Sequence, residues 1–176
     1  MAFIRPTPTG REVFFDIEDV IVSKTDLTGK ITYANNVFLD IAGYEEHEVL
    51  GQPHSMIRHP DMPRSVFKFM WDTLEAEKEI FAYVVNMAKN GDHYWVLAHV
   101  TPTFGASGRP IGYHSNRRVP DAGAVDRVKQ IYAALLAEER KYTDKREQLA
   151  AGTGLLLQTL QGTGMQYDEF VWTLAA

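Results

Sequence analysis

The chain of 176 residues contains no cysteine, and this absence removes several kinds of chemistry at once. It can form no disulfide bond, offers no thiolate ligand to a metal and has no cysteine nucleophile. The absence of disulfides is compatible with a reducing compartment, and we expect a cytoplasmic protein.

Long apolar runs and an excess of positive charge are also lacking. No run is long enough to cross a bilayer, and residues 1–6 have no basic region followed by an apolar stretch. We therefore expect neither a signal peptide nor direct membrane insertion. The net charge of −5 and the pI near 5.7 provide no broad basic field, so nucleic acid is not expected as a partner.

Sequence motifs for catalysis and for backbone binding of phosphate are absent. The sequence has no Gly-x-Gly-x-x-Gly turn and no Walker sequence. No nucleophile-elbow sequence surrounds Ser55, Ser65, Ser107 or Ser115. We expect a protein that is not an enzyme, in which any recognition of phosphate depends on side chains.

Hydrophobic patterns predict an α+β fold with a five-stranded antiparallel sheet and short helices on one face. The helices are inserted after the second strand, and the longest lies between Pro63 and Glu75, where a wide apolar stripe predicts one buried face. The expected strands cover residues 20–24, 31–34, 80–87, 94–104 and 111–118. The expected short helices cover residues 37–42 and 45–50.

The composition divides the chain into a leader (1–19), a compact domain (20–120) and a C-terminal helical extension (121–176). Residues 125–136 form an amphipathic pattern that leaves two interpretations open, a homodimer interface or packing back on the chain's own sheet. Residues 167–174 are unusually apolar for a free tail, so we expect them to dock.

A stiff polar loop is predicted at residues 51–63, where three prolines accompany an arginine, two histidines and an aspartate. Arg58 is the best phosphate ligand in it, because a guanidinium forms paired charge-assisted hydrogen bonds to phosphate oxygens, and His59 adds a donor. Asp61 could orient Arg58 or accept from a ribose or adenine. Composition alone leaves equally open that Arg58 and Asp61 only pair across a turn.

Several runs resemble the PAS domain of the aerotaxis receptor type, over about residues 20 to 120. They are Thr25-Asp26-Leu27, Gly29 to Phe38, Gly43-Tyr44, Glu48 to His54, Arg58 to Pro63, Met70-Trp71 and Lys89 to Val96. The resemblance implies a PAS fold and a noncovalently held FAD whose redox state is passed to a chemotaxis partner. It favours ligand contact by Arg58.

The resemblance also implies the residues that hold the cofactor. Asn35 and Asn86 fall where family asparagines lie near the ligand, although Asn35 suits a helix N-cap equally well. Relatives share Trp71 and Trp95 but usually carry tryptophan where Phe81 stands. The expected cofactor-binding set is Arg58, His59, Asp61, Asn35, Asn86, Trp71, Trp95, Phe67, Phe81, Phe38 and His54.

The expected partner is a membrane-bound methyl-accepting chemotaxis-type receptor or another signalling protein. Full-length relatives carry a membrane anchor and a signalling coiled coil, and this chain is similar instead to the soluble half of bipartite energy-taxis systems. Two alternatives remain, a haem-based gas sensor that uses one of the histidines and a ligand-free PAS interaction module. A light sensor that forms a cysteinyl adduct is excluded, because there is no cysteine.

Overall fold

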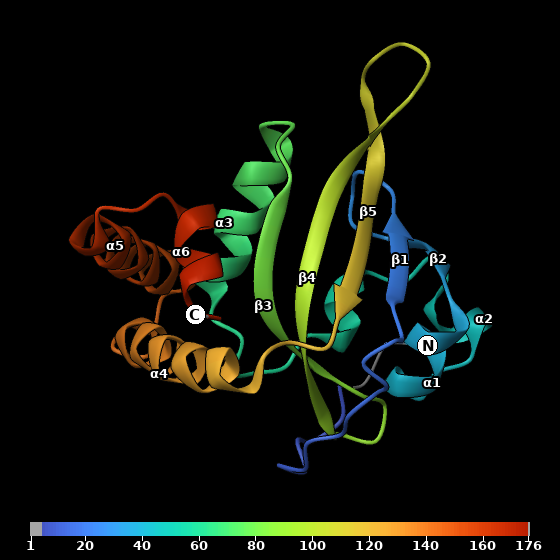
Figure 1. The fold of residues 1–176 in the computed structure, drawn as a ribbon, viewed down its shortest axis with the longest axis horizontal. Coiled ribbons are helices and arrows are strands. Elements are labelled where there is room, and N and C mark those ends of the chain that lie inside the picture. The colour runs from blue at the N-terminus through green and yellow to red at the C-terminus, as the bar shows by residue number, and fades with distance from the viewer. Residues whose placement is uncertain (1–4, 176) are drawn as a thin grey trace.

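A computed structural model describes residues 5–175 and shows an antiparallel sheet in the strand order β2-β1-β5-β4-β3. Figure 1 shows this sheet at the centre of the molecule, with the long β4–β5 hairpin extending beyond it. The strands are β1 (Ile21–Thr25), β2 (Ile31–Ala34), β3 (Ile80–Met87), β4 (His93–Phe104) and β5 (Pro110–Arg118). The predicted five-stranded α+β fold is confirmed.

The segment between β2 and β3 covers the inner face of the sheet with helices. It comprises α1 (Asn36–Ala42), α2 (Glu46–Val49), a 3₁₀ turn η1 (His54–Ile57) and α3 (Arg64–Glu75). α1 ends at Gly43, whose φ of 69° is the left-handed conformation that glycine adopts without strain. The three helices predicted from spacing are therefore confirmed.

The loop 51–63 differs in part from its prediction as a stiff polar loop. It contains η1, and it buries Met56, Ile57 and Met62 in the core. Its polar side chains therefore project from a segment that apolar anchors hold against the domain. The backbone of Arg58 also pairs with that of Asn86 on β3, which fixes the loop to the sheet.

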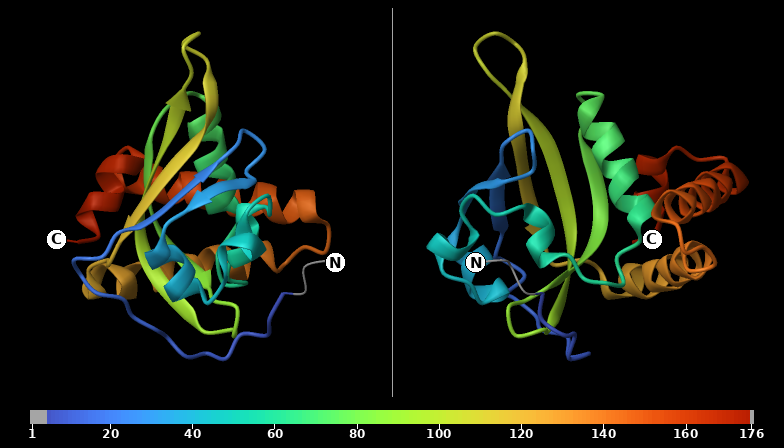
Figure 2. Two further views of the ribbon diagram at one scale, coloured as in Figure 1. Left: turned by 90° about the vertical axis from the view of Figure 1, so that its right-hand side faces the viewer. Right: turned by 180° about the vertical axis from the view of Figure 1, so that it is seen from behind.

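The C-terminal extension forms α4 (Ala122–Glu139), α5 (Lys145–Thr163) and α6 (Tyr167–Thr173). α4 lies on the outer face of the sheet, where the Tyr132 hydroxyl donates to the carbonyl of Tyr83 at 2.6 Å. On α6, Val171 is buried and the Trp172 ring lies 4.9 Å from that of Phe81. Of the two interpretations of α4, the structure shows packing back on the sheet. Figure 2 shows the three helices gathered beside α3.

The leader passes along the β3–β4 turn, and its first four residues lie outside the described part, as does residue 176 of the extension. The carboxylate of Asp92 accepts hydrogen bonds from Thr9 (2.6 Å) and from Nε of Arg11 (2.9 Å). These bonds hold the leader on the hairpin. None of the helices within residues 5–175 is long and apolar enough to cross a membrane.

Candidate functional site

A cavity of about 80 Å³ lies between the inner face of the sheet, α3 and η1. Strand residues reach it through two-residue alternation, which places every second side chain of β1, β3, β4 and β5 on this face. The lining residues are Ser23, Thr25, His54, Arg58, Phe67, Met70, Trp71, Leu74, Val84, Asn86, Ala98, Val100, Tyr113, Ser115 and Arg117. The cavity is thus built by six segments: β1, η1 with Arg58, α3, β3, β4 and β5.

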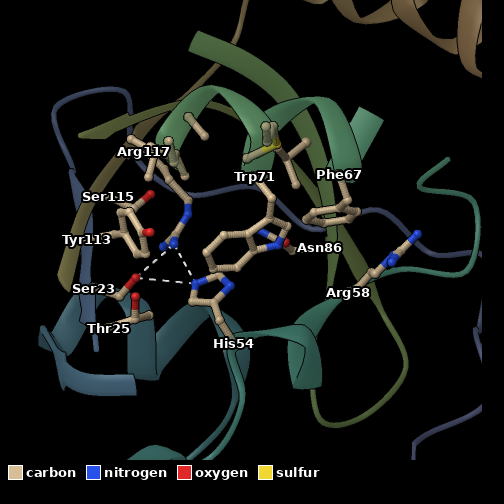
Figure 3. Close-up of a pocket in the computed structure, with 15 residues that line it drawn as sticks. Ser23, Thr25, His54, Arg58, Phe67, Trp71, Asn86, Tyr113, Ser115 and Arg117 are labelled. Carbon is tan, nitrogen blue, oxygen red and sulfur yellow. Dashed lines mark hydrogen bonds between the residues drawn. The ribbon is translucent and has the colours of Figure 1, made fainter. Parts of the chain in front are cut away.

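One wall of the cavity is apolar and is contributed by α3. Phe67, Met70, Trp71 and Leu74 follow the i, i+3, i+4, i+7 spacing of a single helix face. Figure 3 shows the indole of Trp71 in the middle of the site, between His54 and Asn86. This wall offers a flat aromatic surface to a planar ligand.

The opposite side of the cavity is polar and is organised by Arg117 on β5. Its Nη2 donates to the Ser23 hydroxyl at 2.8 Å and to Nε2 of His54 at 2.6 Å (Figure 3). Nε2 of His54 must be the unprotonated ring nitrogen, since a guanidinium only donates. Burial and the nearby guanidinium lower the pKa of His54 to about 3, so the imidazole is neutral at pH 7.

Three buried polar atoms at this cavity have no hydrogen-bond partner among the described residues. They are Nδ2 of Asn86, Oγ of Ser115 and Nη1 of Arg117. Buried polar groups are normally satisfied, because an unmet donor costs roughly 1–3 kcal/mol. The three atoms therefore suit a ligand whose edge carries hydrogen-bond acceptors.

A groove of about 460 Å³ adjoins the cavity and shares His54, Arg58, Phe67 and Trp71 with it. Its lining includes four cationic side chains: Arg58, Arg64, Lys68 and Lys145. The guanidinium of Arg58 lies 4.3 Å from the centre of the Phe67 ring and donates to the carbonyl of Met62 at 3.0 Å. Burial, with Arg64 and Arg5 nearby, lowers the pKa of Arg58 to about 10, so it remains charged at pH 7.

The structure brings five of the expected cofactor-binding residues together at the cavity: Arg58, His54, Phe67, Trp71 and Asn86. Asn35 instead caps α1, where its side-chain oxygen accepts from the backbone N–H of Phe38 at 3.0 Å. The N-cap interpretation is therefore confirmed. Phe38 lies behind the cavity, fully buried, with its ring edge-on to His54.

The remaining four expected residues lie elsewhere. Trp95 and Phe81 are on the outer face of the sheet, where Trp95 packs against Tyr132 of α4 and Phe81 stacks on His99. His59 is buried beside the ring of His93, and its Nδ1 accepts from the N–H of Asp61. The carboxylate of Asp61 is mostly exposed and lies 3.6 Å from Arg140, so it does not pair with Arg58.

Sequence reasoning missed the polar side of the cavity, namely Ser23, Ser115 and Arg117. A signal was available in β5. Tyr113, Ser115 and Arg117 are spaced two residues apart, so their side chains must share one face of the strand. Charged residues in a polar loop stand out as phosphate ligands, whereas a charge at an inward strand position, such as Arg117, does not.

We expect the neutrality of His54 to make stability depend on pH. Because its folded pKa of about 3 is below its ordinary value of 6.5, the unfolded chain binds the proton first as the pH falls. The free energy of unfolding should then decrease below about pH 6.5, by up to about 1.4 kcal/mol per pH unit. Urea unfolding between about pH 7 and pH 5 measures this slope.

The variant His54→Gln should show a shallower slope than the wild type, since glutamine can accept from Arg117 without titrating. Burial also lowers the pKa of His59 and of His114, so only the difference between variant and wild type reports on His54. His47→Gln, at an exposed position of α2, is the matched control. Equal slopes in all three proteins would contradict the assignment.

Comparison with known proteins agrees with this geometry. A family model described as the PAS fold matches residues 31–117. The aerotaxis receptor of Escherichia coli (strain K12) is 42% identical over 120 residues, which cover 68% of this chain and 24% of the receptor. The nitrogen fixation regulatory protein of Klebsiella pneumoniae is 30% identical over 99 residues, 56% of this chain and 20% of that protein. The chain thus spans a quarter or less of either relative's length.

Solved structures share the fold. A light-oxygen-voltage domain studied with a flavin analogue superposes with a TM-score of 0.55 and 20% identity, over 65% of this chain and 87% of that one. A PAS domain from Colwellia psychrerythraea gives a TM-score of 0.53 and 21% identity, over 57% of this chain and 86% of that one. With the sheet order and the helices described above, the family model and the relatives show that the chain contains a PAS domain.

Proposed function

We propose that this chain is a cytoplasmic redox sensor that binds FAD noncovalently and reports the redox state of the flavin to a signalling partner. The observation that carries the proposal is the cavity with its aromatic wall, its three unpaired polar atoms and its adjoining cationic groove. Similarity to an aerotaxis receptor supports it. The bound flavin would supply the redox chemistry, and the chain would supply binding and charge.

The residues of the cavity fit the isoalloxazine ring in chemistry. One edge of that ring carries carbonyl and ring-nitrogen acceptors, and the free donors of Asn86 and Arg117 are suited to them. The present volume is below the roughly 300–1,000 Å³ of usual ligand pockets, so lining side chains must move when a flavin binds. Trp71, which lines both cavity and groove and is only partly buried, is the first we expect to shift.

The groove suits the pyrophosphate of a dinucleotide. Its cations compensate for the missing glycine-rich motif, because side-chain guanidinium and ammonium groups can neutralise phosphate directly. Lys68 is partly engaged by Asp72 at 2.6 Å, whereas Arg58 is held over Phe67 at the junction of groove and cavity. Arg58 is therefore the principal phosphate ligand in this proposal.

The haem alternative is disfavoured by the engagement of His54. Among the described residues it is the histidine that lines the cavity, and its Nε2 already accepts from Arg117. An iron ligand there would leave the guanidinium facing a metal cation. A flavin can bind without breaking the hydrogen bond between Arg117 and His54.

Output is proposed to pass through the sheet to α4 and from there to a membrane-bound chemotaxis-type receptor or another signalling protein. Asn86 borders the cavity on β3, and Tyr83 on the same strand accepts the hydroxyl of Tyr132 on α4. Signalling requires that the two redox states differ in affinity for the partner. A homodimer through the PAS domain and C-terminal helix remains part of the proposal.

An absorbance spectrum of the purified chain tests the proposed function. We expect the bands of an oxidised flavin, and chromatography of the released cofactor should identify FAD rather than FMN. A Soret band would support the haem sensor instead. Protein that stays colourless after incubation with FAD would contradict the proposal and favour a ligand-free interaction module.

A further inference from the structure

Arg117 is a buried cation that no anion in the described part of the chain compensates. Its residue surface is 3% exposed, and among the described residues no carboxylate forms an ion pair with it. Its guanidinium donates to the neutral groups of Ser23 and His54, and Nη1 has no partner among residues 5–175. The hydroxyl of Tyr94, a neighbour on β4, is also buried and unpartnered.

A structural explanation of this arrangement is weak. Burying an unpaired charge costs several kcal/mol, and buried arginines are usually paired with carboxylates for that reason. Two hydrogen bonds to neutral groups recover only part of that free energy. The arrangement therefore lowers the stability of the ligand-free protein and indicates that a charge is kept for use in the bound state.

The surroundings indicate where the opposite charge belongs. Arg117 lines the cavity, and the two other unpaired atoms there, on Asn86 and Ser115, belong to neutral groups. The groove cations beside Arg58 are a separate set, since Arg117 does not line the groove. Arg117 can therefore contact the part of a ligand that enters the cavity, and it does not contact phosphates in the groove.

We propose that Arg117 is the counter-charge for a negatively charged flavin ring in the cavity. This inference rests on the proposed function and goes beyond it, because it assigns a residue that sets which redox form is bound more tightly. Oxidised flavin is neutral in its ring, whereas fully reduced flavin that has lost its N1 proton carries one negative charge. Arg117 stabilises the reduced anion preferentially and so raises the midpoint potential of the bound flavin.

The test compares Arg117→Met and Arg117→Lys with Arg118→Met. Arg118 is the next residue of β5 and is exposed, so it controls for loss of a positive charge from the same strand. Each purified protein is loaded with riboflavin, which has no phosphate for the groove, and titrated electrochemically with mediators. The ligand-free forms are unfolded in urea.

We expect Arg117→Met to weaken binding of the reduced anion by roughly 10- to 100-fold more than it weakens binding of oxidised riboflavin. The potential would become more negative by about 30–60 mV, at about 30 mV per tenfold for a two-electron couple. Arg117→Lys should retain much of the wild-type potential. The ligand-free Arg117→Met protein should be at least as stable as the wild type.

Two results would overturn the inference while leaving the proposed function intact. One is an unchanged midpoint potential in Arg117→Met that binds riboflavin. The other is a ligand-free Arg117→Met protein that is clearly less stable than Arg118→Met, which would make Arg117 structural. If the wild-type chain takes up neither riboflavin nor FAD, the proposed function fails first, and the counter-charge assignment fails with it.

Discussion

Arg58→Ala is expected to weaken FAD binding by roughly 10- to 150-fold while changing riboflavin binding by less than about fivefold. The first figure corresponds to losing one charge-assisted hydrogen bond to phosphate, about 1.5–3 kcal/mol. Riboflavin has no phosphate, so it reports only on the slot that Arg58 helps to form by lying over Phe67. Titrations followed by the quenching of flavin fluorescence measure both ligands.

Arg109→Ala is the matched control for this experiment, because Arg109 is exposed in the β4–β5 hairpin and lines neither cavity nor groove. It should leave both affinities unchanged. A parallel loss of FAD and riboflavin in Arg58→Ala would show that the guanidinium shapes the ring slot and does not bind phosphate. Asp61→Ala, expected from sequence to matter as well, is a useful comparison, since its carboxylate lies beside Arg140.

Glu139→Ala is expected to have the largest effect on stability, a loss of roughly 2–4 kcal/mol in the free energy of unfolding. Glu139 is buried at the end of α4, and its carboxylate accepts from the N–H groups of Arg64 (3.1 Å) and Ser65 (2.9 Å). It also accepts from the Ser65 hydroxyl at 2.8 Å. Alanine would leave three donors unsatisfied at the positive end of α3.

The size of this effect follows from how α3 begins. The residue before it is Pro63, which makes no side-chain capping bond, so Glu139 provides the cap from another helix. Gly152 of α5 packs against the same carboxylate. A side chain at this position would clash, because its Cβ would lie 2.6 Å from a carboxylate oxygen of Glu139. Loss of Glu139 therefore weakens the contacts among α3, α4 and α5 at one point. Urea unfolding of the ligand-free chain measures the loss in the free energy of unfolding.

Glu138→Ala is the control, because the half-buried Glu138 forms an i,i+3 ion pair with the exposed Lys141, and such pairs near the surface are worth about 0–1 kcal/mol. Similar losses in the two variants would contradict the capping role of Glu139. Under the proposed function this contact also bears on signalling, since it joins the end of α4 to the first residues of α3, which follow the loop that carries Arg58. A Glu139→Gln variant that folds but no longer signals would fit this connection.

Local pattern predicted most of the fold and part of the site. The apolar stripe of α3 was visible as residues 67, 70, 71 and 74, and these are the residues that wall the cavity. Trp95 was expected to hold the cofactor together with Asn86, yet the register pairs Asn86 with Tyr94, so Trp95 faces the other side of the sheet. Consecutive residues of a strand face opposite sides of the sheet, and resemblance to a motif does not show which side a given residue faces.

The sequence by itself determined the strands, the helices, the absence of thiol chemistry and the motifs typical of a PAS domain. These depend on hydrogen bonding and side-chain periodicity over a few residues, or on residue identity alone. Only the tertiary structure decided which buried polar groups meet. Arg117 bonds to His54, which lies 63 positions away in the sequence. Glu139 caps α3 by bonding to Arg64 and Ser65, which lie 75 and 74 positions away. Such pairs form because packing removes water from both partners, and no local pattern encodes that encounter.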